Sequence, residues 1–136
     1  MRKADAPGRL MIQVGLGELI DKVTILRIKS NKIKDPSKLV NVRNELETLE
    51  SARTQYCADS NKFTELEDKL HAINLDLWQI EDDIRLCEAN GDFGADFISL
   101  ARSVYITNDK RAEVKMQINI LDNSAIVEEK SYTEFN

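Results

Sequence analysis

The sequence has few of the residues from which metal sites and cross-links are built, with two cysteines and one histidine among its 136 residues. Cys57 and Cys87 lack CxxC spacing, and neither has a histidine neighbour, since the only histidine is His71. A zinc site is therefore not expected, and we predict no metal and no cofactor. Cys87 falls on an apolar helix face, where we expect it to pack as a small hydrophobic residue.

Long apolar runs are also missing. No stretch approaches the ~20 apolar residues that a membrane-spanning helix needs. The N-terminus, MRKADAPGRLMIQV, begins basic but contains no apolar segment long enough for a signal peptide. We therefore predict a cytoplasmic protein with reduced cysteines and without a membrane span.

Glycine and proline are scarce, at 5 and 2 residues, while hydrophobic residues make up 42% and charged residues 32% of the chain. This composition is typical of a helix-rich folded protein, and its length suits a single helical domain over residues 1–136. The net charge of −5 repels phosphate backbones, and no local basic patch stands out. We therefore expect no nucleic-acid partner.

One apolar seam dominates the middle of the chain. Between Phe63 and Cys87, hydrophobic residues recur at alternating spacings of three and four. This heptad period predicts a single long helix that packs along a partner. Counted over residues 62–89, the helix would be about 42 Å long and would span the molecule.

Two further helices are predicted before the long one. The first covers about residues 18–33. The second covers 37–57 and follows Asp35-Pro36, in which Asp35 can cap the helix and proline is tolerated at its first position. A strict apolar seam in the second helix predicts that it forms an antiparallel hairpin with the helix over 62–89. Arg53 interrupts that seam, and its charge can reach solvent or pair with an acid on the neighbouring helix.

After a glycine stop at Gly91, the C-terminal region is expected to hold one kinked helix or two short ones, with a break near Thr107 to Asp109. Residues 1–9 should be flexible, and 123–136 should form an extended tail that can pair as a short strand with residues 10–14. The fold class is thus all-α, with a possible strand pairing of the termini.

Trp78 and Glu81 lie on one stripe beside the long seam. Such a stripe is typical of a solvated or interface flank. The alternative is a polar shelf in a pocket, with Trp78 as a stacking wall and Glu81 as a ligand or base.

The remaining candidate ligand-binding residues come from both ends of the chain. Polar pairs of the first helix, one turn apart, usually support the helix surface. The cations and amide near the C-terminus can hold a phosphate or carboxylate, or can neutralise acids of neighbouring helices. The candidates in these two regions are Glu18, Asp21, Lys22, Arg102, Asn108, Arg111 and Lys115.

Three motifs carry a resemblance to a known family: GELIDKVTILRIK at 17–29, FISLARSVYITNDKRAEVKMQIN at 97–119 and EEKSY at 128–132. Over about residues 12–132 the chain resembles a functionally uncharacterised family of short helical bacterial and phage proteins, often encoded near sugar-transferase genes. That family usually opens with Ser-Pro-Gly-Glu, where this chain has Gly15-Leu16-Gly17-Glu18. The difference removes a hydroxyl cap from the first helix. By this likeness the motif polar residues also include Lys29, Asp109, Glu128, Lys130 and Tyr132.

Two functions are consistent with these patterns. The first is a non-catalytic helical binding or assembly module, accessory to surface-glycan biosynthesis and forming a homodimer or binding a protein partner. The second is a small-molecule enzyme or binding protein for an anionic ligand held by Arg102, Arg111 and Lys115. An enzyme requires these charges to converge with a carboxylate in a pocket that has room for a ligand. A binding module requires them to be mutually paired or spread over an open face.

Overall fold

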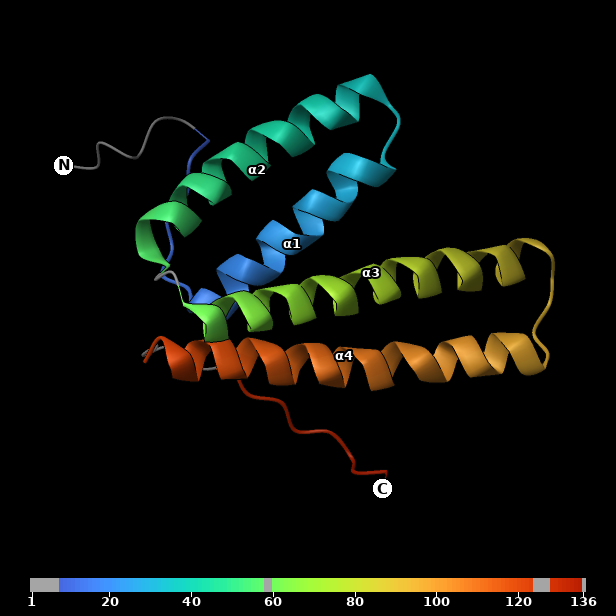
Figure 1. Cartoon of the computed structure of the whole chain (residues 1–136). Coiled ribbons are helices and arrows are strands. Elements are labelled where there is room, and N and C mark those ends of the chain that lie inside the picture. The colour runs from blue at the N-terminus through green and yellow to red at the C-terminus, as the bar shows by residue number, and fades with distance from the viewer. Residues whose placement is uncertain (1–7, 58–59, 124–127, 136) are drawn as a thin grey trace.

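The structure, a computed structural model, describes residues 8–57, 60–123 and 128–135. Within these ranges it contains four helices and no strand (Figure 1). The helices are α1 (Leu16–Lys32), α2 (Pro36–Tyr56), α3 (Asn61–Ala89) and α4 (Ala95–Leu121). The predicted all-α fold is therefore confirmed, and none of these helices is long and apolar enough to cross a membrane.

The long central helix forms where the heptad seam predicts it. Ser60 caps α3 by accepting a hydrogen bond from the backbone N–H of Phe63 at 3.1 Å. The helix ends before Gly91, whose φ of +65° places it in the left-handed region that favours glycine. At 29 residues, α3 is about 43 Å long.

The helices pair differently from the prediction. α1 and α2 form one hairpin and α3 and α4 form another, whereas the backbone of α2 does not approach that of α3 (Figure 1). The predicted hairpin between residues 37–57 and 62–89 is therefore wrong. A heptad seam indicates that a helix has a partner but does not say which helix it is. Here α1 and α4 lie beside the seam of α3, and the backbone of α2 lies beside that of α1 alone.

The main hydrophobic core lies where α1, α3 and α4 meet. α2 contributes no buried residue to this core, and its one buried residue is Val42. Burial of about 25 cal/mol per Å² of apolar surface makes this three-helix contact the main source of stability. The core residues are Leu16, Ile20, Phe63, Leu66, Leu70, Ile73, Leu77, Val114 and Ile118.

The C-terminal region also departs from the prediction. α4 runs without interruption through Thr107–Asp109, so the expected break is absent. Asn108 does not cap a new helix, because its side-chain oxygen accepts a hydrogen bond from Arg111 one turn further along α4, at 3.4 Å. Asp92 accepts a hydrogen bond from the backbone N–H of Gly94, and the helix starts after that turn.

Neither terminus forms the expected strand in the part that is described. Residues 10–14 and 128–135 contain no helix and no strand, so the predicted pairing is not found there. Most of the predicted flexible N-terminus and residues 124–127 of the predicted tail lie outside the described residues.

The two halves of the α3–α4 hairpin differ in their surroundings. We give the name distal arm to residues 78–106. They comprise the C-terminal part of α3, the turn and the N-terminal part of α4. From Trp78 to Glu113 every residue is partly or fully exposed, and none is as buried as the residues of the core. The distal arm extends beyond the four-helix body, and no third helix lies beside α3 and α4 within it (Figure 1).

Candidate functional site

A buried carboxylate joins α1 to α4. Asp21 is 1% exposed, and its carboxylate accepts two hydrogen bonds from the Arg111 guanidinium. Arg111 Nε lies 2.8 Å from Asp21 Oδ1, and Nη2 lies 2.5 Å from Oδ2. Two parallel charge-assisted hydrogen bonds of this kind fix geometry as well as charge. The hydrogen bond to Asp21 raises the pKa of Arg111 above its ordinary value, despite the opposing effect of burial.

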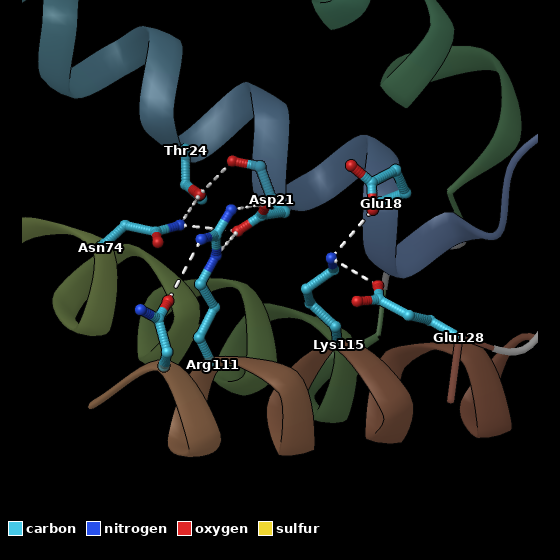
Figure 2. A network of polar contacts seen from close by, with 8 residues as sticks. Glu18, Asp21, Thr24, Asn74, Arg111, Lys115 and Glu128 are labelled. Carbon is cyan, nitrogen blue, oxygen red and sulfur yellow. Dashed lines mark hydrogen bonds and ion pairs between the residues drawn. The ribbon is translucent and has the colours of Figure 1, made fainter. Parts of the chain in front are cut away.

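Two neutral side chains complete the shell around Asp21 (Figure 2). The amide nitrogen of Asn74, on α3, donates to Asp21 Oδ1 and to Thr24 Oγ1, at 3.0 Å in each case. The Thr24 hydroxyl in turn donates to the backbone carbonyl of Asp21 at 2.9 Å. One buried acid therefore holds α1, α3 and α4 together. Thr24 was not among the residues predicted from the sequence, although it lies one turn after Asp21 on the same face of α1.

A second ion cluster lies beside the first (Figure 2). The Lys115 ammonium, on α4, is 2.8 Å from a carboxylate oxygen of Glu18 and 2.8 Å from one of Glu128. Burial acts to lower the pKa of Lys115, but the hydrogen bonds to Glu128 and Glu18 outweigh it and raise that pKa. The same contact with Lys115 lowers the pKa of Glu128. Lys115 therefore ties both α1 and the C-terminal tail to α4.

The start of α1 is capped by another helix. Gly15 provides no side-chain cap, but the backbone N–H of Gly17 donates to the Asn119 side-chain oxygen at 2.7 Å. The backbones are so close that a Cβ on Gly17 would lie 2.4 Å from the Lys115 carbonyl oxygen. Asn119 therefore replaces the hydroxyl cap that the sequence lacks, and Gly17 permits the close approach.

A third network joins α2 to the rest of the molecule. The buried Glu67 carboxylate, on α3, accepts two hydrogen bonds of 2.6 Å from Arg53 and one of 3.2 Å from Arg27. Arg27 also donates to Glu50 at 2.6 Å. Burial opposes the charge of Glu67, but Arg53 and Arg27 outweigh it and lower its pKa. The pairing of Arg53 with an acid of a neighbouring helix confirms one of the two predicted alternatives.

The other predicted residues lie outside these networks. Lys22 pairs with Glu45 at 3.4 Å, with both side chains about half exposed. Glu81 pairs with Arg85 on the exposed surface of the distal arm. Arg102 is exposed on the same arm and forms no ion pair within the described ranges. The predicted cation cluster is therefore formed only in part: Arg111 and Lys115 line one small hollow of about 140 Å³, and Arg102 does not line it.

One cleft nevertheless gathers several predicted residues. It has a volume of about 450 Å³ and opens where the distal arm leaves the body. Trp78 and Glu81 line it from α3, and Asn108 and Arg111 line it from α4. Glu18, Lys22, Arg102 and Lys115 do not line it. Asn74 also lines the cleft, and its side-chain oxygen accepts no hydrogen bond from the described residues, although Asn74 is only 4% exposed.

The contacts define a class of protein: a four-helix domain whose interior charges are neutralised in pairs, with an arm that extends from it. The chain belongs to a family of unknown function (DUF6165), which matches residues 10–135. No curated protein and no solved structure matches the chain. Among the described residues, no group of three or more His, Cys, Asp or Glu side chains is placed to hold a metal ion.

Proposed function

We propose that this chain is a non-catalytic helical assembly module that acts as a homodimer. The observation that supports this most directly is the pairing of Arg111 with Asp21 and of Lys115 with Glu18 and Glu128. These cations have the chemistry of an anion site, but their charges are already neutralised by carboxylates of the same chain. They act as clamps between helices.

An anionic ligand at Arg111 would have to displace Asp21. Asp21 is buried, and a buried carboxylate that loses its partner destabilises a protein by about 3–5 kcal/mol. That loss would offset most of the binding energy of a small anion. The motif residues of α1 and α4 therefore serve the fold, and the binding surface lies elsewhere.

The proposed cellular setting comes from the resemblance to bacterial and phage proteins encoded near sugar-transferase genes. We propose that the module is a cytoplasmic accessory of surface-glycan biosynthesis, which assembles other proteins and does not itself transform sugars. The paired interior charges support a structural role in that setting, since they offer no free acid, base or nucleophile at the helix junction.

Sedimentation velocity over a range of protein concentrations tests the homodimer. We expect a dimer at tens of micromolar and dissociation on dilution. A monomer throughout that range would contradict the proposal. The purified chain should also show no thermal shift with phosphosugars, nucleotides or dicarboxylates, and a clear shift with one of these classes would favour a ligand-binding function.

A second candidate function is the binding of a small anionic ligand in the Trp78 cleft. The cleft has enough volume for a small metabolite, and it places the Trp78 ring beside Arg85, whose ion pair with Glu81 is exposed. Trp78 is the one tryptophan of the chain, so its fluorescence reports on this cleft alone. Saturable quenching by a phosphosugar or nucleotide, lost in Arg85→Ala, would support this function, and unchanged fluorescence with every class would exclude it.

A further inference from the structure

We propose that two copies of the chain clasp each other reciprocally, with the distal arm of each docked against the basic tip of the other. The basic tip is defined as residues 28–43, the end of α1, the connection and the start of α2. This inference rests on the proposed homodimer and specifies which surfaces form it.

The distal arm carries apolar side chains that are partly exposed to solvent. Each of them is about half exposed, on a hairpin that has no third helix beside it (Figure 1). Exposed apolar side chains of this kind can be buried in an interface with another molecule. The residues are Leu86, Phe93 and Ile98, at 60%, 55% and 55% exposure. Tyr105, at 45% exposure, also lies on the arm, but its ring packs edge-on against Phe135 of the C-terminal tail.

The same arm is strongly acidic. Residues 78–106 hold six acidic and two basic residues, a formal net charge of −4. Among the described residues the one ion pair in this arm joins Glu81 to Arg85. The other acids of the arm therefore have no cationic partner within the described part of the chain. They are Asp82, Asp83, Glu88, Asp92 and Asp96.

The basic tip has the opposite charge, and it is a local basic segment that we did not expect from the overall composition. Residues 28–43 hold five basic residues and one acidic residue, a formal net charge of +4. None of these cations forms an ion pair with a described residue. The tip also exposes an apolar side chain, Val40, at 56%. The cations are Lys29, Lys32, Lys34, Lys38 and Arg43.

The geometry favours contact between copies. Within one copy the two hairpins splay apart, so the basic tip and the distal arm lie at the ends of two diverging rods (Figure 1). A twofold axis pairs the arm of each copy with the tip of the other and forms the same contact twice. Opposite charges then set the register and speed the encounter, while the exposed apolar residues are buried.

A charge-swap experiment tests this clasp. Asp82→Lys/Asp83→Lys/Glu88→Lys makes the arm basic, and Lys32→Glu/Lys34→Glu/Lys38→Glu makes the tip acidic. We expect each variant alone to show a dimer dissociation constant raised roughly tenfold or more, because both of its charged surfaces now have the same sign. An equimolar mixture should form heterodimers, since both contacts become complementary again.

A matched control carries the same change of net charge outside the arm. Glu65, Asp68 and Asp76 are exposed on α3, and changing all three to lysine should leave dimerisation at the wild-type level. Circular dichroism confirms that each variant remains helical.

Each result bears on the clasp separately from the homodimer. If either charge variant alone dimerises as the wild type does, the clasp is wrong and the homodimer stands. If both variants are monomeric and their mixture remains monomeric, the pairing of arm with tip is wrong. A monomeric wild type would overturn both proposals. Dimerisation that weakens in the arm, tip and control variants alike would show a general charge effect and would also refute the clasp.

Discussion

In the four-helix body α3 is flanked by α1 and α4, whereas in the distal arm the same helix has only α4 beside it. The seam residue Leu70 is fully buried in the body, but Ile80 and Ile84, further along the same seam, are only partly buried. One continuous heptad pattern therefore runs through two environments. The comparison teaches that regular spacing specifies a helix along its whole length, while the number of neighbours determines how stable each part is.

The largest difference between body and arm should appear at their arginines. Arg111→Ala leaves Asp21 buried without a cationic partner, so we expect the free energy of unfolding to fall by about 3–5 kcal/mol. Arg85→Ala breaks an exposed pair on the arm and should change it by less than about 0.5 kcal/mol. Urea denaturation of both variants provides the measurement. A loss below about 1 kcal/mol for Arg111→Ala would show that the buried pair contributes little.

The seam itself offers the next comparison. Leu70→Ala removes a fully buried side chain and should lower the free energy of unfolding by about 2–5 kcal/mol. Ile84→Ala, on the same seam in the arm, should lower it by about 1 kcal/mol, because its site is partly open and can collapse or admit water. Equal losses in chemical denaturation would mean that the arm is as well packed as the body.

The close approach of α1 to α4 gives a third, smaller effect. Gly17→Ala places a methyl group against the Lys115 carbonyl oxygen, at 2.4 Å if nothing moves. We expect a loss of about 1–3 kcal/mol, because the helices must separate and weaken the Gly17–Asn119 hydrogen bond. Ala101→Gly on α4 in the arm serves as a comparison, with a loss of about 1 kcal/mol from helix propensity. A wild-type melting temperature for Gly17→Ala would contradict the tight crossing.

The smallest expected effect depends on pH. The pKa of Glu67 is lowered in the folded state, so its ion pairs with Arg53 and Arg27 contribute stability above the ordinary glutamate pKa. That contribution is lost as the pH falls through the folded-state pKa. Glu67→Gln should therefore be less stable than the wild type by about 1–2 kcal/mol at neutral pH, with the gap closing in acid. A gap that is constant with pH would exclude the ionised state as its cause.

The local features of the fold were predictable from the sequence. The spacing from Phe63 to Cys87 predicted α3, Asp35 predicted the start of α2, and Gly91 predicted the end of α3. The pairing of the helices was not predictable, because α2 and α4 both carry apolar faces suited to α3. The prediction of a break near Asn108 was also wrong. The side chain that was expected to cap a new helix accepts a hydrogen bond from Arg111 within a continuous helix.

The clusters around the motif residues were only partly visible in the sequence. Arg111 and Lys115 were identified as cations beside a core, and neutralising ion pairs were one of the two alternatives. Their partners could not be assigned, since Asp21 and Glu18 are more than 90 residues away in the chain. Helical spacing places Asn119 one turn after Lys115, but its role as a cap for α1 depends on how two distant helices cross.

Hydrogen–deuterium exchange, measured on dilute and on concentrated protein, tests most directly whether the distal arm depends on a second copy. We predict that amides of residues 78–106 exchange much faster than those of α3 in the body when the protein is dilute. They should become protected on concentration, together with residues 28–43, while the body remains unchanged. An arm as protected as the body at every concentration would contradict the account.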